Sequence, residues 1–327
     1  MVDSPSATHD EALGARVVRT DSLVYGVEAQ PDVGTSVSET PKHTQLVHLV
    51  NRLAFVQDDT HCLVLVDLNT GHAWNRSLTA DGSVDAEALA DAPLDLEACT
   101  IVPDSDQQRL IAFGSGADSR QEWVVIIDWS QPGDDPWVIV HEVPEFFEVL
   151  RDVDAPDDTH LNLEGALFVD NDTLRVFFQH TPNEGSPTDA PDLAADVSWT
   201  FMSFYLKDPT RADPPPLTHV RHHDLGTLDD GPLLFSDAHA LSSGALLYAA
   251  TTATNGDAGP AVLGVMTDDD ARYTPLRAED GTLFRGKIEG LRPHPSDPRR
   301  VRFVIDADKM SDASRIYEAE LTGPWAL

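Results

Sequence analysis

The chain has 327 residues, of which 22 are basic and 56 are acidic, so its formal net charge at pH 7 is −34. Nucleic-acid binding needs a basic surface, and the sequence has no cluster of Lys or Arg that would provide one. No apolar run approaches the roughly 18 residues that cross a membrane, and the first twenty residues do not resemble a signal peptide. We therefore expect a cytoplasmic protein without nucleic-acid or membrane partners.

The acidic residues are mostly aspartate: the sequence has 41 Asp and 15 Glu against 18 Arg and only 4 Lys. Such a composition is typical of surfaces that stay hydrated in concentrated salt. A GC-rich genome also favours Arg over Lys, but it would not by itself produce this net charge. We therefore expect a salt-adapted, halophile-like protein, which is an inference about solubility and not about fold.

The two cysteines, Cys62 and Cys99, both lie in apolar runs, and neither has a second cysteine at CxxC spacing. We expect both to be small buried hydrophobic residues. Two cysteines also exclude a disulfide framework.

Short apolar runs of about 5–8 residues, separated by clusters of Asp, Gly, Pro and Asn, predict strands along almost the whole chain. In chain order the clearest runs are 52–57, 62–68, 109–114, 122–128, 137–143, 173–178, 199–206, 245–251, 261–266, 300–306 and 315–321. Only 84–92 and 143–150 have the pattern of short helices. The sequence therefore predicts an all-β protein.

The predicted strands recur in five modules, which begin near residues 44, 95, 162, 237 and 287. Further strand candidates follow at 72–78, 137–143, 217–223 and 273–279, but the last module has none, and 15–23 is placed to supply it. Four-stranded antiparallel units that recur along a chain are typical of a β-propeller. We expect five blades, with the ring closed by the N-terminal strand. A sixth blade within 70–95 or 205–235, a large β-sandwich and two all-β domains are the alternatives.

We expect one domain over residues 1–327, with a flexible segment at 1–12. Residues 181–197, rich in Pro, Asp and Gly, are interpreted as a long loop insertion.

Aligned module starts place a polar pair at positions n and n+2, and residues so spaced share one face of a strand. The pairs are Asp95/Glu97, Asn162/Glu164, Asp237/His239 and Lys287/Glu289, with Gln45 near the equivalent position of the first module. Because inner strands of a propeller converge on its axis, we expect a ring of these side chains around a central channel, with Asp95, Asn162 and Asp237 as ligand contacts.

Converging carboxylates repel one another unless a cation, a basic side chain or a proton neutralises them. Oxygen-rich ligation suits a divalent metal, so we expect Glu97, Glu164 and Glu289 to hold one, with Ca²⁺ as the first choice. The alternative is structural: such a Glu can accept backbone N–H groups of the next blade and lock the blades together.

Loops between second and third strands open on the same face of a propeller. There Ser115 is a candidate ligand contact, and Arg120 would bind an anionic group or neutralise the ring. His180 is a candidate general base, with His239 as the other proton acceptor. The histidines of 219–223 are interpreted as solvated residues of an outer strand.

Three segments carry a family resemblance: NLEGALFVDNDTLRVFF (162–178), KIEGLRPHP (287–295) and GSGADSR (114–120). They resemble bacterial propellers grouped as phytase-like esterases, including an uncharacterised family with the same order of motifs. The "EG" strand start is also similar to that of gluconolactonase (senescence-marker) propellers, and this resemblance implies a Glu that helps to hold one axial divalent metal. The chain departs from the lactonases in lacking a matching Asn/Asp set, and His239 stands in place of a carboxylate.

Two functions follow as expectations. The first is a metal-dependent hydrolase of a small ester, lactone or phosphoester, in which the metal polarises the substrate and His180 or His239 takes a proton. The second is a non-catalytic module that binds a sugar, peptide or protein on the same face. A carbohydrate-active enzyme is a third interpretation and needs two carboxylates at glycosidase separation. We expect a monomer that takes a small-molecule ligand or substrate.

Overall fold

The computed structural model describes residues 2–22, 24–25, 45–49, 52–56, 62–67, 72–78, 94–103, 108–130, 136–154, 159–182, 192–229, 231–252, 259–305 and 315–325. Strands dominate this part of the chain, which confirms the all-β prediction. Its contacts divide it into two compact units. The first comprises Met1–Asp3, Asp58–His61 and Ser77–His223, and the second Ser4–Gln57, Cys62–Arg76 and Asp224–Leu327.

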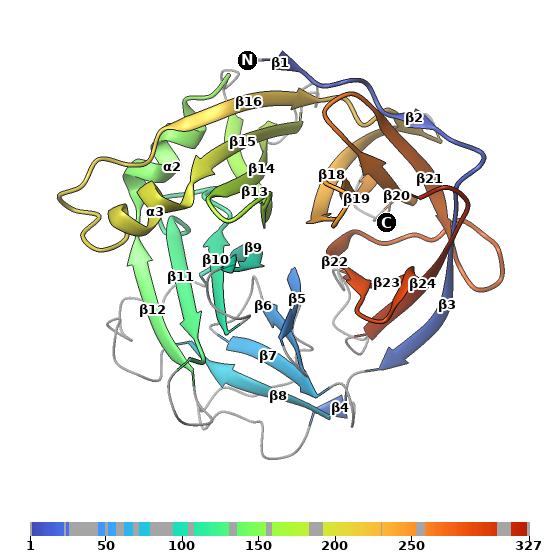
Figure 1. Cartoon of the computed structure of the whole chain (residues 1–327), viewed down its shortest axis with the longest axis horizontal. Helices are drawn as coiled ribbons and strands as arrows, with labels where there is room; N and C mark the ends of the chain where they lie inside the picture. The colour runs from blue at the N-terminus through green and yellow to red at the C-terminus, as the bar shows by residue number, and fades with distance from the viewer. Residues whose placement is uncertain are drawn as a thin grey trace. The chain divides into compact units, whose positions relative to one another are not determined.

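The first unit holds two groups of four consecutive strands (Figure 1). Group 2 comprises β9 (Leu96–Ile101), β10 (Arg109–Gly114), β11 (Trp123–Asp128) and β12 (Trp137–Glu142), and α2 (Pro144–Arg151) follows it. Group 3 comprises β13 (Thr159–Phe168), β14 (Thr173–Pro182), β15 (Asp192–Ser198) and β16 (Leu217–His223), with α3 (Trp199–Tyr205) between the last two. Neighbouring strands within each group pair antiparallel.

Helix α2 covers the core of this unit and confirms the predicted helix at 143–150. A proline in its first turn suits helix initiation because its missing N–H is not needed there. Phe146, Phe147 and Leu150 on one helix face are fully buried, and they pack with strand residues such as Leu161 and Phe178. Burial of an apolar side chain of this size stabilises the fold by about 1.5–3 kcal/mol.

The second unit holds the other three groups (Figure 1). Group 1 comprises β5 (Gln45–Leu49), β6 (Arg52–Val56), β7 (Cys62–Asp67) and β8 (His72–Ser77). Group 4 comprises β18 (Gly231–Ala240), β19 (Leu246–Thr252), β20 (Ala261–Met266) and β21 (Ala271–Arg277), with the short β17 (Thr227–Leu228) beside β18. Group 5 comprises β22 (Ile288–His294), β23 (Asp297–Ile305) and β24 (Arg315–Thr322).

The outer strand of group 5 comes from the N-terminal part of the chain, as predicted. Strand β3 (Gly14–Ser22) pairs antiparallel with the whole of β24, from Ser22 opposite Arg315 to Gly14 opposite Thr322. Three two-residue strands of the same segment, β1 (Val2–Asp3), β2 (Thr8–His9) and β4 (Val24–Tyr25), pair parallel with β16, β21 and β8. Residues within 1–12, expected to be flexible, are therefore partly held in strands.

One predicted strand is a helix, and one predicted loop is a strand. Most of the predicted strand 199–206 forms α3 (Trp199–Tyr205) because its burial has helical spacing: Trp199, Met202 and Tyr205 are buried. The Ser198 hydroxyl caps the first turn by accepting from the N–H of Phe201. The third strand of group 3 is instead β15, which belongs to the expected loop 181–197. The rest of that loop, 183–191, lies outside the described residues.

Several smaller predictions concern single residues, short segments and a membrane span. Cys99 is buried, as expected, whereas the side chains of Cys62 and Gln45 and the helix predicted at 84–92 lie outside the described residues. No helix in the described ranges is long and apolar enough to cross a membrane. The cytoplasmic location stays a prediction.

Candidate functional site

The first long strands of four groups share an irregularity in their pairing. In β9, β13, β18 and β22 the pairing with the second strand skips one residue, which forms a β-bulge. The skipped residues are Glu97, Glu164, Ser236 and Glu289. A bulge takes its extra residue out of the ladder and re-aims its side chain, and bulges are frequent beside functional sites. Three of the four positions carry a glutamate that the sequence singled out.

The fourth position differs from the sequence alignment. The alignment placed His239 with the glutamates, whereas the strand register places Ser236 there, three residues earlier. The alignment followed the acidic residue Asp237, but β18 bulges before that residue. His239 lies further along the strand, opposite Leu247, and its predicted role at the level of the glutamates is not supported by the register.

Glu164 and Glu289 are almost fully buried, and each has a donor two residues earlier on its own chain segment. Glu164 is 3% exposed, and its Oε1 accepts a hydrogen bond from Nδ2 of Asn162 at 2.6 Å. Glu289 is 2% exposed, and its Oε1 lies 2.9 Å from Nζ of Lys287. Burying a carboxylate is costly unless it is paired, so these n/n+2 pairs explain how the glutamates are tolerated.

The pair Asp95/Glu97 consists of two acids and is arranged differently. Asp95 adopts a φ of 51°, in the left-handed region, and its carboxylate accepts from the hydroxyl of Ser115. The Ser115 hydroxyl oxygen also accepts from the N–H of Ala117 at 3.2 Å. Since Ser115 is buried and donates its only hydroxyl proton to Asp95, the two residues fix the turn after β10. The Ser115 hydroxyl proton is thus used by Asp95 and is not available to a ligand.

The same turn joins groups 2 and 3. The N–H of Leu163 on β13 donates to the carbonyl oxygen of Ser115 at 2.9 Å, and β13 lies in contact with β9. Glu97 on β9 and Glu164 on β13 therefore belong to neighbouring inner strands of the same unit. The convergence of their side chains on one site stays a prediction.

Asp237 has a structural environment. Its side chain is fully buried, and its Oδ2 accepts from the N–H of Leu291 at 2.5 Å and lies 3.0 Å from Nη1 of Arg292. Both partners belong to β22, so the carboxylate ties β18 to the neighbouring inner strand. This is the locking role that the sequence offered for the glutamates, and it replaces the ligand contact expected of Asp237.

His180 is not on the face that carries Glu164. Asn162 and Gln179 are opposite each other in the pairing of β13 with β14, whereas His180 is opposite Leu161. Because side chains alternate along a strand, His180 lies on the other face, and its Nε2 donates to the carbonyl oxygen of Val153 at 2.7 Å. Burial lowers the pKa of His180, outweighing this hydrogen bond. The expected role of His180 as base for the carboxylates is therefore not supported.

Arg120 is held at the surface by its own loop. Its guanidinium Nη2 lies 2.9 Å from Oδ2 of Asp118, and its side chain is 70% exposed. The side-chain hydrogen bond from Arg120 lowers the pKa of Asp118, so the pair stays ionised. Because solvent screens an exposed pair of this kind, it contributes little to stability. Arg120 therefore neutralises Asp118 rather than Glu97 or Glu164.

The donor set does not fit a resident metal ion. In the described ranges, no group of three or more His, Cys, Asp and Glu side chains is close enough to hold one. Lys287, next to Glu289, competes with a cation for that carboxylate. The expected Ca²⁺ site thus has no complete ligand set in the part of the chain that the structure describes.

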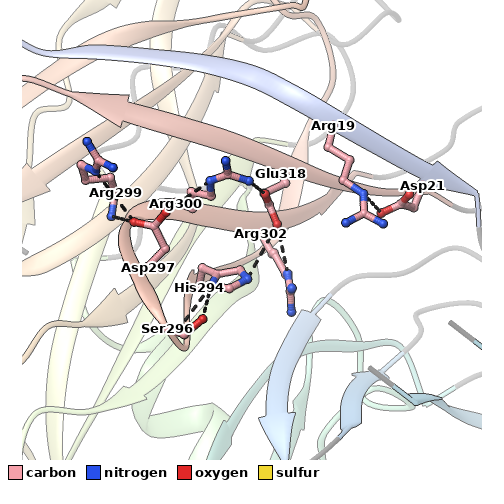
Figure 2. A network of polar contacts seen from close by, with 9 residues as sticks. All are labelled: Arg19, Asp21, His294, Ser296, Asp297, Arg299, Arg300, Arg302 and Glu318. Atoms are coloured by element: carbon pink, nitrogen blue, oxygen red, sulfur yellow. Dashed lines mark hydrogen bonds and ion pairs between the residues drawn. The ribbon is translucent and has the colours of Figure 1, made fainter. Parts of the chain in front are cut away.

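A second polar cluster surrounds Glu318 on β24, shown in Figure 2. The Glu318 carboxylate accepts from Nη1 of Arg300 and lies 3.6 Å from Nε of Arg302 and 3.9 Å from Nε2 of His294. His294 ends β22, whereas Glu289 is near its start, so the two are about 16 Å apart along the strand. The Glu318 cluster is therefore separate from the candidate site.

Sequence reasoning missed Ser236 and Arg292. Ser236 is buried, and its hydroxyl has no hydrogen-bond partner within the described ranges. A pairing role for Arg292 could have been predicted from the sequence, because a charged residue within a buried strand needs a buried counter-charge. Ser236 gave no signal, since only the register shows that it occupies the bulge.

In the described residues, the fold and site define an all-β protein built from five groups of four strands, with a glutamate at a strand bulge in three of these groups. A family model described as a family of unknown function (DUF6910) matches residues 92–310, so the chain belongs to that family. No curated protein matches the sequence significantly. Membership of the phytase-like esterases stays a prediction.

Solved structures with similar strand arrangements include two β-1,3-galactosidases of family GH43. Both are 10% identical to this chain, and each alignment covers 85% of it. The alignments cover 56% and 90% of the two galactosidase chains, and the TM-scores are 0.48 and 0.47. A calcium-binding regucalcin from Agrobacterium tumefaciens is 9% identical, with 88% and 93% of the two chains covered and a TM-score of 0.43. TM-scores below 0.5 are too low to assign a fold or function to this chain.

Proposed function

We propose that the five groups are the blades of a five-bladed β-propeller. Inner strands that follow one another along the chain lie in contact within each unit: β9 with β13, and β18 with β22. The pairing of β3 with β24 also supports the proposal, because sharing one sheet between the two ends of the chain keeps a ring from opening. Each blade would then present the start of its inner strand at the central channel.

Within the first unit, Glu97 and Glu164 line a site that binds a small polyhydroxylated ligand, such as a free sugar, without hydrolysing it. The observation that carries the proposal is the repetition of Glu97, Glu164 and Glu289 at bulges. Burying the carboxylates of Glu164 and Glu289 costs stability at each position, which is easiest to account for by a binding role.

The hydrogen-bonding side chains of group 3 support this proposal. Asn162 and Gln179 are partly exposed and opposite each other, and Asn162 is bonded to Glu164 on the same face. Carboxylates accept hydrogen bonds, and amides both donate and accept. Sugar hydroxyls do both as well, so this set of planar side chains suits them.

Hydrolysis has less support than binding. His180 faces the other side of the sheet, Ser115 donates to Asp95, and Arg120 is paired with Asp118. Hydrolysis of an ester, lactone or phosphoester would need His239 as the base together with a metal ion. The described donors do not assemble the site for that ion.

Calorimetric titration of chelator-treated protein tests the proposal, with a panel of monosaccharides and, separately, with Ca²⁺, Mn²⁺ and Zn²⁺. Glu164→Gln is the test variant, and Glu148→Gln on the exposed side of α2 is the control. We expect saturable binding of a sugar that is lost in Glu164→Gln only, with no release of a hydrolysed product. Saturable metal uptake lost in Glu164→Gln, without sugar binding, would instead establish the metal site. Absence of both would overturn the binding role.

A further inference from the structure

Helix α3, which follows β15 (Figure 1), presents two aromatic side chains to solvent. Phe201 is 59% exposed and Phe204 is 65% exposed, and in the described ranges no large apolar side chain is more exposed than Phe204. Residues three apart are neighbours on a helix surface, so the two rings form one patch. Folding does not require them, because Trp199, Met202 and Tyr205 are the residues that bury the helix. Adjacent exposed apolar side chains indicate contact with another molecule.

The two ends of this helix carry opposite charges. Asp172, an exposed residue of the turn between β13 and β14, lies at its start, where Oδ1 accepts from the N–H of Thr200 at 2.8 Å. Hydrogen bonds from Thr200 lower the pKa of Asp172, so its carboxylate is ionised at neutral pH. At the other end Lys207 extends over Phe204, with Nζ 5.9 Å from the ring centroid. We call Asp172, Phe201, Phe204 and Lys207 the α3 surface.

We propose that the α3 surface pairs with the α3 surface of a second copy of this chain, with the two helices antiparallel about a two-fold axis. An axis midway between Phe201 and Phe204 places Phe201 opposite the partner's Phe204. The same axis places Lys207 opposite the partner's Ser198. The Ser198 hydroxyl donates to Asp172 at 2.9 Å, so Lys207 of each copy lies at the level of the other copy's Asp172. Such an interface is self-complementary, as two-fold symmetry requires.

The charge pattern favours a second copy over a foreign partner. A uniformly basic peptide would be attracted by Asp172 and repelled by Lys207, and an acidic peptide would meet the reverse, whereas an antiparallel copy matches both ends. The aromatic rings at the centre can pack edge to face or offset, which are the arrangements that such rings prefer. Two seven-residue helices form a small interface, so we expect a weak dimer and a monomer in dilute solution.

The net charge of −34 determines the effect of salt on this dimer. Two copies repel one another, and the screening length falls from about 8 Å at about 0.15 M salt to about 3 Å at about 1 M. The affinity should therefore rise with salt, because the repulsion weakens while the contact between the rings persists. The share of the affinity that comes from Lys207 and Asp172 should fall, since salt also screens exposed ion pairs.

Sedimentation velocity of the full chain, in about 0.15 M and about 1 M KCl, tests the proposal. We expect a concentration-dependent species of twice the 35.6 kDa chain mass. Phe204→Ser should weaken the dimer at least about tenfold in both salts, because each copy loses an apolar contact. The control Val18→Ser replaces a side chain that is 40% exposed on β3, and it should leave the dimer unchanged.

A second pair of variants separates the interfacial charges from the net charge. Lys207→Glu and Arg299→Glu each replace a positive charge by a negative one, and Arg299 is 74% exposed on β23. In about 0.15 M KCl the dimer of Lys207→Glu should be about threefold or more weaker than that of Arg299→Glu, because Glu would face Asp172. This difference should shrink in about 1 M KCl.

Four outcomes would overturn the proposal. They are a monomer in both salts at the highest soluble concentration, a dimer equally stable in Phe204→Ser, a dimer weakened as much by Val18→Ser, and equal dimers of Lys207→Glu and Arg299→Glu in the lower salt. All four variants replace exposed side chains, so circular dichroism should show an unchanged fold. If Phe204→Ser does not fold, Phe201→Ser makes the same test with the same expected result.

Discussion

Asp237 and Arg292 form an ion pair that is almost completely excluded from solvent, with side chains 0% and 6% exposed. The pair joins β18 of group 4 to β22 of group 5. The same carboxylate oxygen of Asp237 accepts the N–H of Leu291, and its other oxygen accepts the N–H of Ala238 at 2.7 Å. One carboxylate thus satisfies three donors at the junction of two inner strands.

Replacing Asp237 by Asn should lower the free energy of unfolding by about 3–5 kcal/mol, because the buried Arg292 would lose the counter-charge of Asp237. The double variant Asp237→Asn with Arg292→Met should recover part of this loss, since it buries no charge. Urea denaturation in molar salt measures both. Two results would show that the ion pair does not hold β18 and β22 together. One is a loss below about 1 kcal/mol in the single variant, and the other is a double variant that is less stable than the single variant.

Gly116 occupies a position that tolerates no side chain. Its φ is +71°, and an added Cβ would overlap the ring of Phe147 on α2. Gly116→Ala should therefore cost several kcal/mol, from overpacking as well as from the backbone. Gly244 is a matched control, because its φ is +86° but no atom lies within 4 Å of the added Cβ. Gly244→Ala should cost only about 1 kcal/mol. Equal losses of thermal stability would mean that the contact with Phe147 is unimportant.

We expect the Glu318 cluster to stabilise the fold through the attraction between its charges. In Glu318→Gln, Arg300 and Arg302 would face each other without a shared counter-charge, so we expect a loss of about 1–3 kcal/mol that grows as salt is removed. Asp297→Asn, whose side chain is 32% exposed, should cost less than about 1 kcal/mol. Denaturation at two salt concentrations compares them. A loss in Glu318→Gln that is independent of salt would contradict the electrostatic explanation.

The strands could be predicted because their signal is local. Apolar runs bounded by turn residues, such as 109–114 and 261–266, coincide with β10 and β20. The pairing of β3 with β24 could be predicted too, because the last module had no outer strand. Strand β15 was missed because its burial depends on a distant partner: Asp196 is buried only because Arg175 on β14 pairs with it at 2.6 Å.

The sequence motif marked three residues that occupy bulges, but it did not show the geometry around them. Glu97, Glu164 and Glu289 share a short motif, and they do share a bulge. The face on which His180 lies depends on the register beyond the bulge, and a shift of one residue moves every side chain to the other face. A sequence pattern does not show where the ladder skips a residue, so it did not show that His180 is opposite Leu161 or that His239 lies beyond the bulge of β18.

His223 should make the fold sensitive to mild acid. Burial lowers its pKa to about 4, aided by the nearby charges of Arg175 and Arg221. Between about pH 6.5 and about pH 4 the unfolded chain binds a proton that the folded state does not, so the stability of the fold decreases as the pH falls through this range. At about 1.4 kcal/mol per pH unit the full effect is about 3 kcal/mol.

His223→Phe removes this titration, so its stability should vary less with pH than that of the wild type. His219→Phe, at a side chain that is 70% exposed, should follow the wild type. Urea denaturation across this pH range measures all three, and wild-type and His223→Phe curves that stay parallel would show that His223 is protonated equally in both states.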